Sequence, residues 1–254
     1  MSVDIAVLLS IGRHPASGRN RRSEVDARAL ELALGLGGRI HAIHAGDPGE
    51  PALRDYLGMG LDTLTVLRQP EPGDVLPPLA KHLALLRPSL ILTGSSTEQG
   101  QGSGMLPYLL AHELDLPLLP AIAGIAVNGS LADVLQALPR GRRRQLRIDL
   151  PAMVTIDRAA PAPRQSAFAK ARRGRIEVID MPAGPALVST AREIVARPRP
   201  RRLKIMTGGS AADRLRAATE MQAGRGRLMV DPPADEAARA ILEYLRAEGI
   251  LTSP

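Results

Sequence analysis

The sequence predicts an α/β protein: a mostly parallel, doubly wound, Rossmann-like sheet with helices on both faces, followed by an extended C-terminal arm that ends in a helix. Through residue 114, short apolar runs alternate with amphipathic segments, which is the order of parallel strands joined by crossover helices. The apolar run at 90–92 is bounded by Pro88 and Gly94, as expected for a strand that is buried on both faces.

Each element of the first half follows from its local pattern. Strands are expected over residues 3–9, 39–45, 64–67 and 90–92, and helices over 24–36, 51–59, 75–86 and 105–114. Ser23 is expected to cap the first helix, with Asp26 three residues later completing a capping-box-like pair. Gly37 is expected to end that helix. Residues 12–22 are polar and basic, and are expected to form a loop.

The pattern changes after Pro120. Strands are expected over residues 122–127, 131–138, 145–148 and 152–156, with Asn128–Gly129 as a hairpin turn. Further on we expect linkers at 159–163 and 197–202, a basic loop at 168–175, a short helix within 182–196 and an amphipathic helix over 234–248. The chain is therefore expected to have two parts, an α/β domain over 1–180 and an arm over 181–254.

The composition limits the class of protein. The net charge is +7 and the isoelectric point about 10.6, but aromatic residues make up only 2%, and binders of single-stranded nucleic acid use aromatic stacking. An acidic protein partner explains the basic clusters at least as well. The chain has no cysteine, which excludes disulfides and thiolate catalysis and fits a cytoplasmic protein. No apolar run is long enough for a membrane helix, and the N-terminus does not resemble a signal peptide.

The glycine-rich turn after the strand at 90–92 is the main candidate site. It holds small and polar residues, among them Gly100, Gly102 and Gly104, and it leads into a helix. A helix N-terminus with glycines beside it can hold a phosphate. An ordinary flexible βα loop explains the same residues, because the turn matches neither GxGxxG nor GxxxxGK[ST]. The five histidines show no metal-binding spacing and no nucleophile elbow is present, so we expect neither a metal site nor a hydrolase.

Several stretches in order resemble one family. They are SEVDARALELAL at 23–34, RDYLGMGLDTL at 54–64, the turn and helix at 94–117, LPAMVTID at 150–157, and the basic segment at 163–178. Together they resemble the β subunit of electron-transfer flavoproteins over residues 5–178, with a weaker likeness in the C-terminal helix. Ser23 replaces the family's asparagine, and Met105 replaces its glutamine.

The resemblance implies an electron-carrier subunit rather than an enzyme. The β subunit pairs with an α subunit that holds the redox FAD, and the C-terminal arm and helix would pack on that partner. It binds AMP in most members, or a second FAD in electron-bifurcating ones. It docks a flavin-dependent dehydrogenase, and electrons then pass to a membrane quinone reductase. Two alternatives stay open: a bifurcating-type subunit with a second FAD, and a basic nucleotide- or nucleic-acid-binding regulatory module, although we expect no nucleic acid partner.

The resemblance also implies site residues. The expected nucleotide pocket consists of Val7, Ser23, Asp26, Ala45, Gly46, Ser95, Ser96, Gly100, Gly102, Ser103, Gly104, Met105 and Leu106. Phe168 falls on the leucine that anchors the family's recognition loop in the dehydrogenase, and we expect Lys170, Arg172 and Arg173 to attract an acidic partner. Leu138 replaces an acidic residue that lies near the α-subunit flavin in relatives, within a basic hairpin at 140–147.

Overall fold

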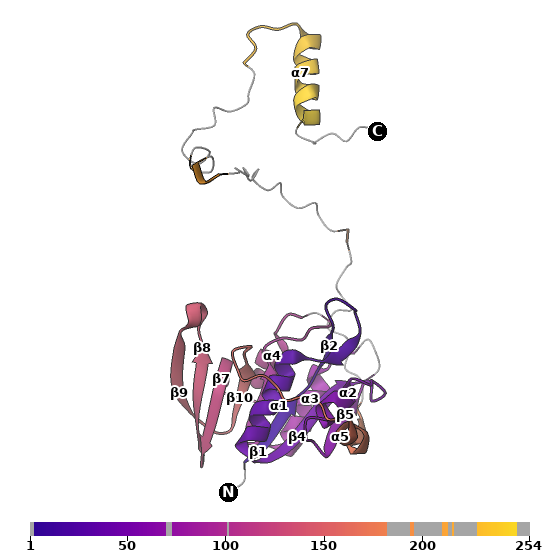
Figure 1. The fold of residues 1–254 in the computed structure, drawn as a ribbon, viewed down its shortest axis with the longest axis vertical. Helices are drawn as coiled ribbons and strands as arrows, with labels where there is room; N and C mark the ends of the chain where they lie inside the picture. The colour runs from indigo at the N-terminus through magenta and orange to yellow at the C-terminus, as the bar shows by residue number, and fades with distance from the viewer. Residues whose placement is uncertain are drawn as a thin grey trace. The chain divides into compact units, whose positions relative to one another are not determined.

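The computed structural model describes residues 3–69, 73–100, 102–181, 194–195, 210–212, 215 and 228–247, in two units, 1–192 and 193–254. The first unit is built on a nine-stranded sheet. Its strands are β1 (Asp4–Leu8), β4 (Arg39–Gly46), β5 (Thr63–Arg68), β6 (Leu90–Gly94), β7 (Leu118–Asn128), β8 (Leu131–Ala137), β9 (Arg143–Asp149), β10 (Ala152–Ile156) and β11 (Arg175–Asp180). Their order is β11-β5-β4-β1-β6-β10-β7-β8-β9 (Figure 1).

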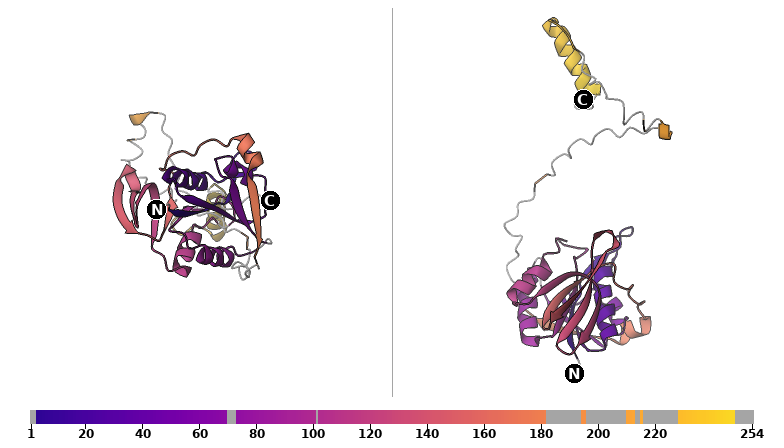
Figure 2. Two further views of the ribbon diagram at one scale, coloured as in Figure 1. Left: turned by 90° about the horizontal axis from the view of Figure 1, so that it is seen from below. Right: turned by 90° about the vertical axis from the view of Figure 1, so that its left-hand side faces the viewer.

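Helices cover both faces of this sheet (Figure 2). One face carries α1 (Glu24–Leu36) and α2 (Leu53–Leu57), and the other carries α3 (Leu76–Leu86) and α4 (Leu106–Glu113). Along β1 the side chains alternate, so that Ile5 and Val7 belong to the core beneath α1 while Ala6 and Leu8 belong to the core beneath α3 and α4. Among the described strands of this sheet, only β8 runs antiparallel to its neighbours, β7 and β9. The mostly parallel sheet confirms the predicted fold class.

The start and end of α1 follow the predicted capping residues, with one difference. The Ser23 hydroxyl accepts a hydrogen bond from the Asp26 backbone N–H at 3.5 Å, and Gly37 ends the helix in the left-handed region with φ 68°. The reciprocal half of the capping box is wrong. The Asp26 carboxylate does not return to the Ser23 N–H, because it is taken by backbone groups at the ends of two strands.

Two segments that were expected to be loops are regular structure. Residues 12–22 belong to an antiparallel hairpin of β2 (Ile11–Arg13) and β3 (Asn20–Arg22). Apart from Ile11, which packs against the core, its strands carry glycine, asparagine and arginine and bind polar side chains of the loop after β6, so no apolar alternation marks them. The basic segment forms α5 (Phe168–Arg173) and leads into β11, an edge strand parallel to β5. The β7–β8 turn is centred on Gly129–Ser130, one residue later than expected, because Asn128 still pairs with Leu131.

The second unit contains α7 (Ala234–Ala247), which confirms the predicted amphipathic helix. The expected helix within 182–196 and the linker at 197–202 lie outside the described residues, apart from 194–195. On α7 the side chains of Ile241 and Tyr244 are exposed. In the described parts of the chain, no helix combines the length and the apolar content needed to cross a membrane.

Candidate functional site

A cavity of about 520 Å³ opens at the carboxyl ends of β1, β4 and β6. In the sheet, β1 lies between β4 and β6. The chain builds the sheet outward from β1 through β4 and β5, then crosses back to place β6 on the other side of β1. Ligands of open α/β sheets bind at the carboxyl edge where the strand order reverses in this way. The volume lies within the range of small-molecule sites.

Asp26, in the first turn of α1, holds the ends of β1 and β6 together. Its carboxylate accepts hydrogen bonds from the backbone N–H and hydroxyl of Ser10, and from the backbone N–H of Gly94 at 2.8 Å. Asp26 is only 3% exposed, and burial raises its pKa although these donors act in the opposite direction. A Cβ at Gly94 would lie 2.2 Å from Asp26 Oδ1. The two central strand ends are therefore fixed in close contact with this one side chain.

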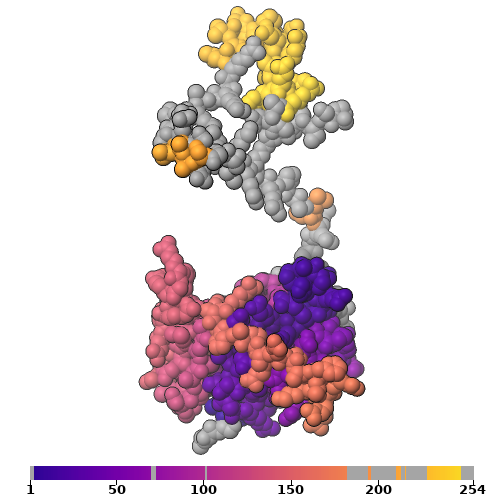
Figure 3. Space-filling view, in the orientation of Figure 1, coloured from indigo at the N-terminus to yellow at the C-terminus, as the bar shows by residue number. Residues whose placement is uncertain are grey.

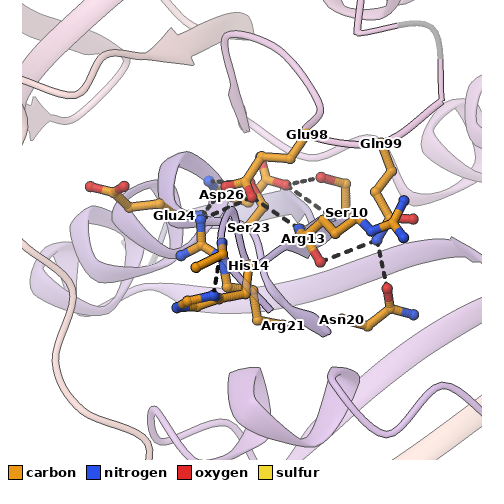
Figure 4. Close-up of polar contacts among 12 residues, drawn as sticks. Ser10, Arg13, His14, Asn20, Arg21, Ser23, Glu24, Asp26, Glu98 and Gln99 are labelled. Carbon is orange, nitrogen blue, oxygen red and sulfur yellow. Dashed lines mark hydrogen bonds and ion pairs between the residues drawn. The ribbon is translucent and has the colours of Figure 1, made fainter. Parts of the chain in front are cut away.

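Glu98 fixes the glycine-rich loop, residues 95–100 and 102–105, against α1 and the hairpin (Figure 4). Its carboxylate accepts hydrogen bonds from the backbone N–H groups of Arg13 at 3.0 Å and Glu24 at 3.1 Å, and from the Arg21 guanidinium at 3.0 Å. Glu24 is the first residue of α1, so a carboxylate already occupies the positive end of that helix. The start of α3 also lines the cavity, but the Asp74 carboxylate accepts from the Leu76 N–H there at 3.0 Å. The start of α4 is therefore the helix start that remains for an anion in the cavity.

Gln99 and Asn20 extend this network to the loop after β4. The Gln99 amide donates to the carbonyl of Gly12 at 3.1 Å and to the side-chain oxygen of Asn20 at 3.0 Å. The Asn20 amide in turn donates to Glu50 at 2.8 Å. The β2–β3 hairpin therefore connects the loop after β6 with the loop after β4, and both loops line the cavity.

The structure brings most of the expected nucleotide-site residues to this cavity. Those that line it are Asp26, Ala45, Gly46, Ser96, Gly100, Gly102, Ser103, Gly104, Met105 and Leu106. Three others do not line it. The side chain of Val7 lies in the core beneath α1, Ser23 is buried as the N-cap, and Ser95 is exposed. Gly104 has φ 69°, and a Cβ there would lie 2.8 Å from the Ser95 carbonyl oxygen, so only glycine fits that position.

The cavity lining is acidic. It includes Asp26, Asp47, Glu50 and Asp74, and it contains no lysine or arginine among the described residues. The start of α4 has no side-chain cap at Met105, so backbone N–H groups there and in the loop can donate to an anion, beside the hydroxyl groups of Ser96 and Ser103. The carboxylates suit hydroxyl and amino groups. No group of three His, Asp or Glu side chains suited to a metal ion occurs within the described residues.

Several lining or supporting residues were not predicted from the sequence. Ser10 lies two residues after β1 and Asp47 directly follows β4. The rule that sites lie at carboxyl strand ends could have found both. His44, one of the five histidines for which the sequence gives no metal-binding spacing, also lines the cavity. Asp74 lies in a loop without a recognisable motif. Glu98 lies in the glycine-rich loop but outside its pattern of glycines and serines, so the contacts of these two residues in three dimensions identify their roles.

A second candidate region is the crossing segment, residues 157–174, which connects β10 to β11 over α1 and α2 (Figure 3). Arg164 donates to Glu31 of α1 through its backbone N–H and its guanidinium, at 2.8 to 3.0 Å, and this pairing lowers the pKa of Glu31. The Ala167 N–H donates to the carbonyl of Gly58 at 2.9 Å. A Cβ at Gly58 would lie 1.9 Å from Ser166 Oγ, so the segment approaches α2 as closely as glycine allows.

The crossing segment presents α5 at the surface. Arg54 of α2 donates to the carbonyl oxygens of Ala171 at 2.9 Å and Gly174 at 3.3 Å, which satisfies groups left free at the C-terminal end of α5. Phe168, the only phenylalanine of the chain, is 76% exposed on this helix. The Arg172 guanidinium lies 5.9 Å from the centre of its ring, within cation–π range.

The three expected cations of the partner-recognition surface all lie on α5. Lys170, Arg172 and Arg173 are all exposed, and Arg172 stacks on Phe168. The structure therefore groups the four expected partner-recognition residues, Phe168, Lys170, Arg172 and Arg173, on one short helix. Gly60, which follows α2, lies nearby, because a Cβ there would be 3.8 Å from Lys170 Nζ.

The basic hairpin of β8 and β9 is a separate surface. Arg147 pairs with Asp133 through two hydrogen bonds at 2.7 and 3.1 Å, and Arg144 donates twice to the Gln136 side-chain oxygen. Leu138 is half-buried at the turn and its N–H donates to the Arg142 carbonyl at 3.0 Å. Two arginines of this hairpin, Arg144 and Arg147, therefore bind partners within the hairpin itself.

Comparisons of the sequence with known proteins identify one family. The family model for the electron transfer flavoprotein domain matches residues 16–184. An electron transfer flavoprotein subunit beta from Chromohalobacter salexigens is 47% identical over 260 residues, which cover 98% of this chain and 96% of the relative. A Bacillus subtilis protein of the same name is 27% identical over 170 residues, 61% of this chain and 65% of the relative. The chain belongs to the electron transfer flavoprotein β-subunit family.

Proposed function

We propose that this chain is the AMP-binding and dehydrogenase-docking subunit of a heterodimer. The heterodimer accepts electrons from flavin-dependent dehydrogenases and passes them to a membrane quinone reductase. Family membership implies the α-subunit partner, and we assign the redox FAD mainly to that subunit. The observation that carries the proposal is the acidic cavity at the strand-order reversal, where the start of α4 is available for a phosphate while Asp74 occupies the start of α3.

The lining chemistry favours AMP in this cavity. A single phosphate can be placed at the start of α4 beside Gly102, Ser103 and Gly104, where backbone donors and the helix dipole favour an anion. Elsewhere the lining offers carboxylates at Asp47 and Asp74, which accept hydrogen bonds from ribose hydroxyl or base amino groups. A ligand with one phosphate and several hydrogen-bond donors matches this lining, which has donors at the start of α4 and carboxylates elsewhere. The diphosphate of a second FAD would place more charge close to the same carboxylates.

The surface of α5 supports the docking role. An exposed aromatic side chain on a helix that is fixed to the domain can enter a partner pocket without a large ordering cost. Phe168 meets this description, because Arg54, Gly58 and Arg164 fix the crossing segment that carries it. The exposed cations beside it attract an acidic partner and mainly raise the association rate.

The C-terminal helix supports the pairing with an α subunit. The helix α7 is amphipathic, and its side chains at Ile241, Leu242 and Tyr244 are 60%, 39% and 53% exposed. Apolar helix faces of this kind are usually buried in a partner. We therefore propose that the arm and α7, within residues 181–254, pack on the α subunit.

The composition of the native heterodimer tests the proposal. The complex is purified with its α subunit, denatured, and its released nucleotides are identified by mass spectrometry. We expect one FAD and one AMP per heterodimer, and a colourless β chain when it is expressed alone. Two FAD per heterodimer, or tightly bound flavin on the isolated chain, would support the bifurcating type instead. A complex with no adenine nucleotide would contradict the assignment of the cavity.

A further inference from the structure

His44 is the one histidine that lines the cavity. It lies near the end of β4 and is only 7% exposed. Its Nδ1 lies 2.8 Å from the carbonyl oxygen of Leu9, the residue after β1. The ring is therefore fixed between two of the strands whose ends form the cavity.

The contact with Leu9 determines which ring nitrogen carries the proton. A carbonyl oxygen only accepts hydrogen bonds, so Nδ1 must be the donor. Burial lowers the pKa of His44, and the nearby Glu50 and Asp47 oppose that shift only in part. A neutral imidazole with its proton on Nδ1 has a lone pair on Nε2. His44 therefore offers an acceptor and no second donor.

Gly46 leaves the space beside that acceptor open. A Cβ at Gly46 would lie 2.6 Å from His44 Nε2 and 3.3 Å from its Cε1, so any other residue would cover the nitrogen. Gly46 lines the same cavity. The hydrogen bonds of the described residues use Nδ1 of this ring and include none to Nε2. Because His44 lines the cavity, Nε2 is left as an acceptor for a hydrogen-bond donor on a ligand.

We propose that His44 Nε2 accepts a hydrogen bond from the 6-amino group of the bound purine, so that the cavity selects 6-amino over 6-oxo purine nucleotides. This inference rests on the proposed nucleotide function. A 6-oxo purine presents a carbonyl oxygen at the same place, and two acceptors cannot form a hydrogen bond. The carboxylates of Asp47 and Glu50, which act electrostatically on His44, also disfavour a carbonyl there. These carboxylates therefore favour a 6-amino over a 6-oxo purine, as Nε2 does.

The test measures nucleotide selectivity in the nucleotide-depleted heterodimer by titration calorimetry with AMP, IMP and 2′-deoxy-AMP. We expect the wild type to bind AMP at least about tenfold more tightly than IMP, the factor for one net hydrogen bond. His44→Leu should weaken AMP binding by about tenfold and remove the preference. His44→Gln, which keeps one donor and one acceptor, should keep part of it. His82→Ala, a histidine outside the cavity, is the matched control and should bind like the wild type.

Three results would overturn the inference. Equal affinity of the wild type for AMP and IMP would do so without any variant, so the test does not depend on the folding of His44→Leu. If His44→Leu weakens AMP and IMP equally and removes the preference for AMP over 2′-deoxy-AMP, then His44 contacts the ribose instead. If the wild type binds none of the three nucleotides, the proposed function of the cavity fails as well. The first two results leave that proposed function intact.

Discussion

The cavity and α5 are opposite kinds of surface on one domain. The cavity is concave and is lined by carboxylates, without lysine or arginine among its described residues. The surface of α5 is exposed and basic, with one large apolar side chain, Phe168. The first suits a small ligand with several hydrogen-bond donors and one phosphate, and the second suits an acidic protein with an apolar pocket.

The same two helices position both surfaces. On α1, Asp26 holds the strand ends at the cavity, while Glu31 binds Arg164 of the crossing segment. On α2, the Tyr56 hydroxyl donates to the Ser10 carbonyl at 2.8 Å, while Arg54 binds the end of α5. Because neighbouring residues of one helix serve different surfaces, substitutions should separate nucleotide binding from docking.

The largest expected effect comes from Asp26→Ala. The change leaves the buried N–H of Gly94 without its acceptor and removes the partner of Ser10. Each unsatisfied buried group costs roughly 1–3 kcal/mol, so we expect the free energy of unfolding to fall by about 3 kcal/mol in urea titrations, together with loss of bound nucleotide. Asp149→Ala, an exposed aspartate on β9, is the control. If Asp26→Ala keeps wild-type stability and nucleotide content, the role given to this carboxylate is wrong.

Phe168→Ala should affect docking and leave the cavity intact. A buried aromatic anchor contributes about 2 kcal/mol to binding, or roughly thirtyfold in affinity. We therefore expect a raised half-saturation concentration for electron uptake from the cognate dehydrogenase, with unchanged α-subunit pairing, FAD and nucleotide content. The matched control is Leu85→Ala, since Leu85 is also 76% exposed but lies on α3. Unchanged uptake kinetics in a folded Phe168→Ala heterodimer would refute the assignment.

Arg54→Ala should weaken docking from a distance. Arg54 touches the carbonyl oxygens at the end of α5 and not Phe168 itself, so its loss should loosen the helix. We expect about fivefold weaker docking, about 1 kcal/mol, and faster amide hydrogen exchange in α5. In a Phe168→Ala background the further loss should be small, because both changes act on one contact. Arg39→Ala, an exposed arginine of β4, should change neither measurement, and fully additive losses would argue for separate roles.

The sequence predicted the parallel part of the fold because that part is built from apolar periodicity. The strands β6 and β10 are buried along their whole length, and their residues form continuous apolar or small runs. The hairpin of β2 and β3 was missed because its strands, apart from Ile11, bind polar residues such as Glu98 and Gln99 rather than a core. Such polar pairing has no period, so it cannot be recognised along the chain.

The candidate sites were likewise predicted only where the local sequence identifies them. The glycine-rich loop was found from its composition, and it lines the cavity. The carboxylate side of the cavity was missed, since Asp47 and Asp74 come from separate loops that meet only in the folded sheet. The segment with Phe168 was expected to be a loop because it lacks apolar spacing, but its helix is held by Arg54 and by close approach to α2. Long-range contacts of this kind override local preference.

The smallest expected effect is a pH dependence that distinguishes the cavity from α5. Burial lowers the pKa of His44, and the charged groups acting on the ring are Glu50 and Asp47. The unfolded chain therefore binds a proton at this histidine more readily than the folded chain, and stability should fall as the pH decreases through the ordinary histidine range toward the lowered value. AMP binding should weaken only as the pH approaches and passes below that lowered value, because the folded chain then binds a proton on Nε2, which removes the acceptor. Urea titrations and calorimetry from pH 8 to pH 5 should show both changes in the wild type and a smaller dependence in His44→Leu. Dehydrogenase docking through Phe168 should not follow this titration, since the charges on α5 are those of lysine and arginine. If His44→Leu shows the same pH dependence of stability and of AMP affinity as the wild type, another group controls the cavity.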